Sequence, residues 1–260
     1  MAAFGRYCGI DYSGAGTPAS GLPGLRLFLA DGDAPPVEVC PARGRSRYWS
    51  RRGLADWLAG ALAEATPALV GIDHAFSFPE AYFAHHGLER DWDAFLDDFA
   101  GHWPTDRADV TVDAVRRGQC GAGPYRGGDA RWRRHCERRA GGAKSVFHFD
   151  VPGSVAKSTH AGLPLLRALR RAAGNRAGFW PFDGWWPPAG RSLVAEVYPA
   201  LWRTGPPAHG RTPDQEDART VALRLQAGDR GGELAHWLTP GIGPEAAAHA
   251  AYEGWILGVV

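Results

Sequence analysis

Short apolar segments alternate with turns over the first third of the chain, and they predict three β-strands. The apolar segments cover residues 6–12, 25–30 and 37–40, and the turns between them are rich in Gly, Pro and Asp. Segments of this length between turn residues are typical of strands. Because short connections usually join strands that are neighbours in a sheet, we expect these three to form an antiparallel meander.

A helical spacing of apolar residues follows the three strands. It runs through residues 51–65 and is set by Leu54, Leu58, Ala61, Leu62 and Ala65. This spacing places the apolar side chains on one face of a helix, which Pro67 ends. Residues 68–72 then form a fourth apolar strand. A strand that returns through a helix can pair in parallel with the first strand, so this order predicts a mixed sheet.

The pattern changes at about residue 79, where strand-like segments give way to helical ones. We place a helical, arginine-rich insertion at about 79–150. Beyond it, we expect helices at 161–173, 212–227, 232–238 and 245–257, and a strand at 193–198. The aromatic cluster at 179–186 favours core or loop packing over a platform for stacking bases. The expected fold class is α/β, a mixed sheet flanked by helices in one domain that spans residues 1–260.

The tripeptide Gly-Ile-Asp occurs twice, each time where a predicted strand ends. Asp11 ends the first strand and Asp73 ends the fourth. A carboxylate at the end of a buried strand is costly unless N–H donors, a cationic side chain or a metal ion compensates its charge. If the two strands pair in parallel, both carboxylates meet at one edge of the sheet. We therefore expect them to bind a divalent cation.

Three further acids are candidates for the same site. Glu196 interrupts an apolar strand, where it either binds metal or forms an ion pair. Asp217 lies beyond the first turn of a helix capped by Thr212, so the helix dipole does not explain it; Asp214 is within that turn and shares a helix face with Asp217. The predicted catalytic residues are Asp11, Asp73, Glu196 and Asp217, and Asp214 joins them as a metal ligand. Carboxylates suit Mg²⁺ or Mn²⁺, and a two-metal site hydrolyses phosphodiester bonds.

The order of these elements is similar to the ribonuclease H-like fold, whose nucleases carry acids on strand one, strand four and a late helix. Five segments, residues 9–14, 71–79, 153–159, 196–200 and 252–256, resemble the family called domain of unknown function 429. The resemblance runs from the first strand to the C-terminus and is weakest in the arginine-rich middle. That family is described as predicted nucleases of ribonuclease H fold. The resemblance implies that Asp11 bridges two metal ions, Asp73 is a second ligand, and Asp217 with Asp214 supplies the late helical acid.

Arginine accounts for 27 of the 29 basic residues, although the net charge is only +1. Near neutrality argues against a protein that coats nucleic acid, but it permits a local basic patch. Residues 131–139 contain five arginines. They form either a solvated helix face or a phosphate-binding surface, and the residues expected to bind nucleic acid there are Arg131, Arg133, Arg134 and Lys157.

Other features restrict the class of protein. No apolar segment approaches the roughly 20 residues that span a bilayer, and the N-terminus lacks a signal-peptide pattern, so we expect a cytoplasmic protein without a membrane partner. The four scattered cysteines predict reduced thiols. Nothing in the pattern indicates an oligomeric state.

Two alternatives to a nuclease remain open. One is a non-catalytic module of the same fold that binds nucleic acid or another partner through its arginines. The other is an actin-like nucleotide-binding phosphotransferase, because Asp11 is followed by a glycine-rich turn. Such phosphotransferases normally use two domains and a longer chain to enclose ATP.

Overall fold

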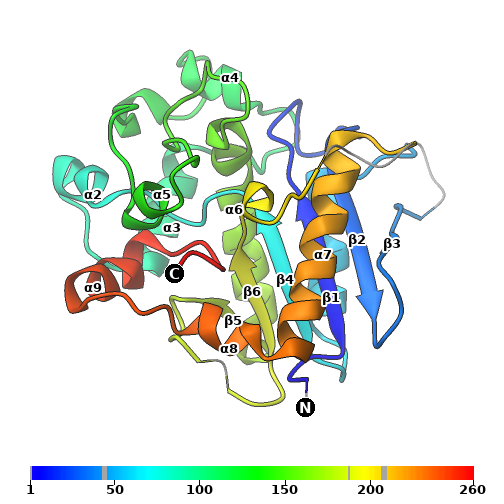
Figure 1. Ribbon diagram of the computed structural model, residues 1–260. Helices are drawn as coiled ribbons and strands as arrows, with labels where there is room; N and C mark the ends of the chain where they lie inside the picture. The colour runs from blue at the N-terminus through cyan, green and yellow to red at the C-terminus, as the bar shows by residue number, and fades with distance from the viewer. Residues whose placement is uncertain (1, 43–45, 187, 206–209) are drawn as a thin grey trace.

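One mixed β-sheet forms the centre of the protein in the computed structural model, which describes residues 2–42, 46–186, 188–205 and 210–260 (Figure 1). Its strands are β1 (Arg6–Asp11), β2 (Arg26–Asp31), β3 (Val37–Glu38), β4 (Ala68–Asp73), β5 (Ala177–Trp180) and β6 (Ser192–Glu196). Their order in the sheet is β3-β2-β1-β4-β6-β5. The first three strands are antiparallel neighbours and the others pair in parallel, so the predicted meander and the parallel pairing of β1 with β4 are confirmed.

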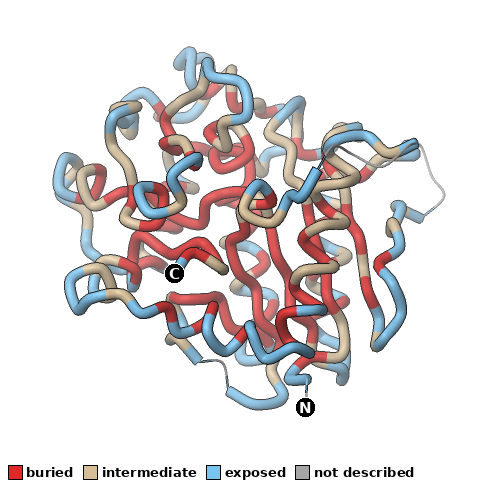
Figure 2. Tube along the Cα trace, viewed as in Figure 1, coloured by how far each residue is buried: buried red, intermediate tan, exposed pale blue. Residues whose placement is uncertain are grey.

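Helices cover both faces of the sheet. On one face lie α1 (Arg51–Ala61) and α6 (Ala156–Ala173), and on the other lies α7 (Pro213–Gly231), which crosses the front of β1 in Figure 1. The chain ends with α8 (Glu233–Leu238) and α9 (Pro244–Glu253). Buried residues concentrate in the sheet and on the helix faces turned towards it (Figure 2). The prediction of a mixed sheet flanked by helices is confirmed.

Residues 79–150, where we expected a helical insertion, are all described and contain no strand. They form α2 (Glu80–His86), α3 (Trp92–His102), α4 (Val112–Arg116), a 3₁₀ turn at Gly123–Arg126 and α5 (His135–Arg139). Aromatic rings hold this part together: Phe78 packs edge-on against Phe95, Phe99 and Phe147. In Figure 1 these helices lie beside the β6 end of the sheet.

Several predicted boundaries differ from the structure. The first helix ends at Ala61 instead of residue 65, and β3 is only two residues long. Strand β5 was not predicted, because its four residues are buried throughout and therefore show no alternation of apolar and polar side chains. Two of the aromatic residues assigned to packing, Phe179 and Trp180, belong to this strand.

The glycines of the two Gly-Ile-Asp tripeptides allow α7 to lie close to the sheet. A Cβ atom at Gly9 would lie 2.1 Å from the carbonyl oxygen of Ala218 and 2.5 Å from the amide nitrogen of Ala222. A Cβ atom at Gly71 would lie 2.8 Å from side-chain atoms of Val197 and Val221. The tight contact between strand and helix brings the acids of α7 over the ends of β1 and β4.

We expect Gly9→Ala to lower the free energy of unfolding by about 2–3 kcal/mol, because the added methyl group meets main-chain atoms of α7 that cannot rotate away. The matched control is Gly60→Ala in α1, where a Cβ atom meets nothing within 4 Å. That substitution should stabilise the protein by up to about 1 kcal/mol, because alanine favours helix. Urea denaturation measures both effects, and equal stability of the two variants would contradict the close packing of α7 on β1.

Within the described ranges, no helix combines the length and the apolar composition that crossing a membrane requires.

Candidate functional site

Asp11 and Asp73 lie opposite each other in the parallel pair formed by β1 and β4. Asp11 lies two residues after Gly9, and Asp73 lies two residues after Gly71. Both glycines face α7, and residues two apart on a strand share a face, so both carboxylates lie on the α7 side of the sheet. The same cavity is lined by Asp214 and Asp217 of α7. The structure thus brings together four of the five acids that the sequence predicts as metal ligands.

The start of α7 explains how its two acids reach the cavity. The side chain of Thr212 accepts a hydrogen bond from the amide of Gln215, and the side chain of Gln215 accepts one from the amide of Thr212. This capping box fixes the first turn of the helix. Asp214 and Asp217 follow with a spacing of three, which puts them on one helix face above the strand ends.

The cavity has room for more than the four carboxylates. Its volume is about 360 Å³, whereas a water molecule in the liquid takes about 30 Å³. Gly153, Ser154 and Ser158 line the wall next to the start of α6, and Tyr198 and Arg203 line the side next to β6. There is therefore space for several water molecules or for a hydrated cation.

Burial and the neighbouring acids raise the pKa of Asp11 and of Asp73. Burial raises the pKa of Asp11 well above its usual range, and the charges of Asp73, Asp214 and Asp217 add to the effect. For Asp73, burial followed by the charges of Asp217 and Glu196 raises the pKa to about 8, while Arg203 acts in the opposite direction. A divalent cation in the cavity would favour the ionised forms and relieve this repulsion.

Asp73 should therefore make stability depend on pH in the metal-free protein. Its pKa is about 8 in the folded state, compared with 3.8 for an unperturbed carboxyl group. The folded state holds the proton more tightly, so wild type should lose stability relative to Asp73→Asn as pH rises from about 4 to about 8. Denaturation in EDTA at several pH values measures this difference. Parallel stability curves for the two proteins would contradict the raised pKa.

Arg203 already compensates one of the four acids. Its Nε donates a hydrogen bond of 3.0 Å to Asp217, and its Nη2 donates to the other carboxylate oxygen. Among the residues that the structure describes, no three of the four carboxylates bring one oxygen each within 4.8 Å of one another. A shared ion would thus need side-chain rotations and the release of Asp217 from Arg203.

Glu196 does not belong to the acidic cavity. It pairs in register with Ile72 and not with Asp73, so its side chain leaves the strand on the other face, where it lines a small second cavity that Asp73 also borders. There it accepts hydrogen bonds of 2.7 and 2.5 Å from the guanidinium of Arg134 and one of 3.1 Å from the amide of Phe76. Its charge is compensated without a metal, so the structure corrects its predicted role as a ligand. The sequence left two roles open for Glu196, metal ligand or ion-pair partner, and the structure shows the ion pair.

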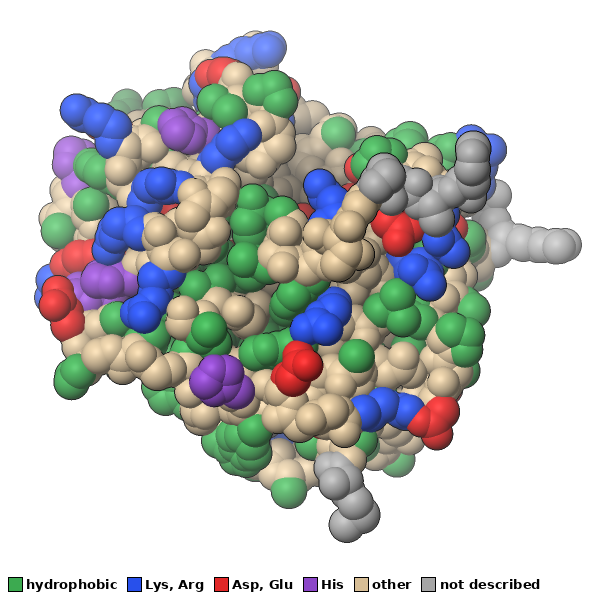
Figure 3. All heavy atoms as spheres, viewed as in Figure 1, with side chains coloured by type: hydrophobic (Ala, Val, Ile, Leu, Met, Phe, Trp, Pro, Cys, Tyr) green, Lys and Arg blue, Asp and Glu red, His purple; other side chains and the backbone are tan. Residues whose placement is uncertain are grey.

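The predicted phosphate-binding residues do not form one continuous surface. Arg134 is fully buried and cannot contact a nucleic acid, which corrects that assignment. The guanidinium of Arg133 donates to the carbonyl of Ala143. Arg131 is exposed but paired with Asp129, and the amine of Lys157 lies 2.9 Å from Asp113. On the face shown in Figure 3, the basic side chains around α5 are interspersed with acidic and histidine side chains.

A buried network around Arg134 was missed from the sequence. Arg134 also pairs with Glu137, while the carboxylate of Glu253 accepts hydrogen bonds from the amides that begin α2 and α5. The hydroxyl of Ser77 donates to the carbonyl of Tyr252. Three segments that are distant in the sequence, 71–79, 196–200 and 252–256, meet in this network. They are so far apart along the chain that no spacing pattern could connect them.

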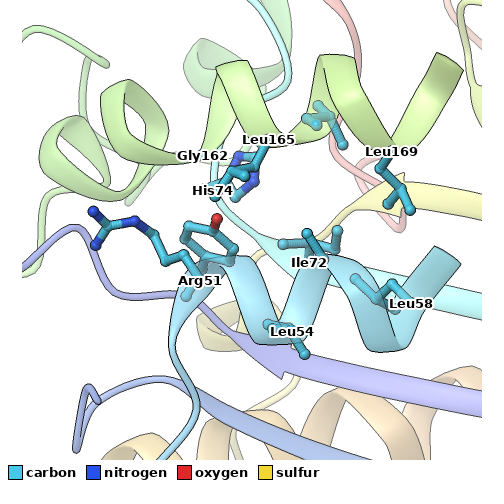
Figure 4. Close-up of a pocket in the computed structure, with 11 residues that line it drawn as sticks. Arg51, Leu54, Leu58, Ile72, His74, Gly162, Leu165 and Leu169 are labelled. Atoms are coloured by element: carbon cyan, nitrogen blue, oxygen red, sulfur yellow. The ribbon is translucent and has the colours of Figure 1, made fainter. Parts of the chain in front are cut away.

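His74 follows Asp73 but faces the other side of the sheet (Figure 4). Its ring packs edge-on against Tyr12 and against Gly162 of α6, and its Nδ1 donates to the carbonyl of Ala75. Burial lowers the pKa of His74 to about 4, so the ring is neutral at physiological pH. It supports the packing of α6 and does not reach the acidic cavity.

The turn after β1 is fixed by Arg51, the first residue of α1, which Figure 4 labels. Its guanidinium donates hydrogen bonds to the carbonyls of Ser13, Ala15 and Gly16. At Gly14 a Cβ atom would lie 2.2 Å from main-chain atoms of Lys157. The turn is thus pinned between α1 and α6.

The possible metal ligands in the acidic cavity are carboxylate and hydroxyl oxygens. Such hard oxygen donors fit Mg²⁺ or Mn²⁺. Asp11 and Asp73 would hold such an ion, and Asp214 and Asp217 would join them only after their side chains rotate. Comparison of the chain with protein-family models, with curated proteins and with solved structures found no match in any of the three.

Proposed function

We propose that this protein is a divalent-cation-dependent phosphodiesterase that acts on nucleic acid. The observation that carries the proposal is the pairing of Asp11 with Asp73 at the ends of adjacent parallel strands, in one cavity with Asp214 and Asp217. The neighbouring acids raise the pKa of Asp11 and of Asp73, and a bound cation would stabilise their ionised forms. Cleavage of phosphodiesters is a reaction that such sites perform.

The order of the strands supports a ribonuclease H-like fold. Three antiparallel strands are followed by a helix and by a strand that pairs in parallel with the first. A late helix, α7, carries further acids to the same edge. The proposal includes membership in the family called domain of unknown function 429, which the sequence motifs suggest. Of the acids in those motifs, Asp11 and Asp73 line the cavity and Glu196 lies outside it.

The chain's own residues would bind and orient the substrate. Cations held by these carboxylates would supply an activated water and neutralise the charge on the leaving oxygen. The N-terminus of α6 forms one cavity wall, and a helix N-terminus attracts phosphate. Arg203, whose guanidinium is paired with Asp217, also lines the cavity and would orient a phosphate oxygen of the substrate.

The two alternatives have less support. A binding module would use the arginines of residues 131–139, but Arg134 is buried and Arg131 is paired with Asp129. An actin-like phosphotransferase needs main-chain groups of the turn after β1 to contact nucleotide phosphates. Such contacts need space beside the main-chain N–H groups of the turn, but the turn packs against the start of α6, where a Cβ atom at Gly14 would lie 2.2 Å from main-chain atoms of Lys157. We expect no binding of ATP in calorimetry.

The proposal is tested by cleavage of single-stranded DNA, double-stranded DNA, RNA and bis(4-nitrophenyl) phosphate with purified protein. We expect hydrolysis of at least one substrate with Mn²⁺ or Mg²⁺ and none in EDTA. Hydrolysis that persists in EDTA, or no hydrolysis of any substrate with either cation, would contradict the proposed activity.

A further inference from the structure

A second group of possible metal ligands lies away from the acidic cavity, between α5 and α9. His135 is the first residue of α5, while Glu245 and His249 are four residues apart on α9. One ligand atom from each lies within 4.8 Å of the other two. The rings of His135 and His249 are nearly parallel, with centroids 4.6 Å apart. Two elements more than 100 residues apart in sequence therefore present three donor groups to one point.

The hydrogen bonds around these residues suit a metal ligand. The Nδ1 atom of His249 lies 2.8 Å from the main-chain carbonyl of Glu245. A carbonyl can only accept, so Nδ1 carries the proton and the lone pair of Nε2 is free to bind a metal. Histidine ligands usually donate their other ring N–H in this way. The main-chain amide of His135 donates to the buried carboxylate of Glu253, which fixes the start of α5.

The donor set differs in kind from that of the acidic cavity. Two imidazoles and one carboxylate form a common zinc-binding set, with water as the fourth ligand. Ligand atoms of tetrahedral zinc lie about 3.3 Å apart, so the three side chains must move closer together. Glu245 is exposed and both histidines are only half-buried, so their side chains have room to rotate. Mg²⁺ and Mn²⁺, which prefer oxygen ligands, should bind in the acidic cavity instead.

We propose that His135, Glu245 and His249 bind one Zn²⁺ ion, which joins the helical segment 79–150 to the C-terminal helix α9. The ion would hold the start of α5, where Arg134, the residue before His135, forms the buried pair with Glu196. Zinc binding should then stabilise this part of the fold. The site is independent of the proposed phosphodiesterase activity.

The test is a titration of metal-free protein, without a polyhistidine tag, with Zn²⁺ in competition with a chromogenic chelator. We expect one tight site per chain in wild type. His249→Ala and Glu245→Gln should weaken it, by at least about 100-fold for the histidine. The matched control is His236→Ala, an exposed histidine on α8 outside the cluster, which should bind Zn²⁺ like wild type. Asp11→Asn should also bind like wild type, which separates this site from the acidic cavity.

A second readout uses thermal unfolding and the absorption spectrum of the Co²⁺ form. Zn²⁺ should raise the unfolding temperature of wild type and of His236→Ala but not of His249→Ala. Co²⁺ should give the intense visible bands of a tetrahedral site in the same two proteins. Because His249 is on a half-exposed helix face, its variant is expected to fold. Equal Zn²⁺ affinity of His249→Ala and His236→Ala, or no stoichiometric site in wild type, would overturn the proposal.

Discussion

Asp11→Asn is expected to reduce metal-dependent phosphodiester cleavage by at least about 10³-fold, the largest effect on activity in this protein. Asparagine keeps the size of the side chain but removes the charge that holds the cation. Loss of metal-ion catalysis forfeits several kcal/mol of transition-state stabilisation, and each 1.36 kcal/mol is a factor of ten in rate. The measurement is the initial rate with Mn²⁺ on the best substrate, with far-ultraviolet circular dichroism as a check of the fold.

The matched control is Asp31→Asn, which removes one negative charge at the end of the sheet where β1 begins. Asp31 ends β2 and lies opposite Arg6, at the start of β1, so it is far from the cavity. We expect this variant to cleave at the wild-type rate. Asp11→Asn should also be more stable than wild type without metal, because burial and the neighbouring acids make the Asp11 charge unfavourable. If Asp11→Asn cleaved the substrate as fast as Asp31→Asn, Asp11 would have no role in the reaction.

Arg134→Ala is expected to cause the largest loss of stability, about 3–5 kcal/mol, which is the usual effect of removing one partner of a buried ion pair. The substitution leaves Glu196 and Glu137 as buried carboxylates without their common cation. It also removes a hydrogen bond to the carbonyl of Glu253. The midpoint of thermal unfolding should fall by roughly 6–20 °C for a chain of this size.

The control for this substitution is Arg131→Ala, three residues earlier. Arg131 is exposed and its pair with Asp129 is solvated, so this substitution should leave the unfolding midpoint close to that of wild type. A double substitution of Arg134→Met and Glu196→Gln should be less harmful than the sum of the single ones, because position 196 then carries no unpaired charge and only Glu137 loses its cation. Similar stabilities of Arg134→Ala and Arg131→Ala would contradict the buried network.

The central strands and the pair Asp11–Asp73 were predictable because they depend on local pattern and on one rule of connection. Each strand shows as an apolar segment, and a strand that returns through a helix pairs in parallel with its neighbour. The start of α7 was predictable from Thr212 and Gln215, which form the expected capping box. Each of these features depends on residues that lie close together in the sequence.

The role of Glu196 was not predictable, because it depends on sheet register. A shift of one residue would place its side chain on the face of Asp73, whereas the structure aligns it with Ile72. The ion pair with Arg134 joins positions 62 residues apart, and nothing in the sequence distinguishes Arg134 from the arginines beside it. The cluster of His135, Glu245 and His249 was missed for the same reason, since only the folded chain brings α5 to α9.

The central claim is that Asp11 and Asp73 bind a divalent cation, and a crystal of the protein soaked with Mn²⁺ tests it most directly. Anomalous diffraction locates manganese without reference to activity. The account predicts a manganese peak at coordination distance, about 2.0–2.3 Å, from carboxylate oxygens of both residues, with Asp217 released from Arg203. An absence of manganese between the two carboxylates at millimolar Mn²⁺, with the Arg203–Asp217 pair intact, would contradict it.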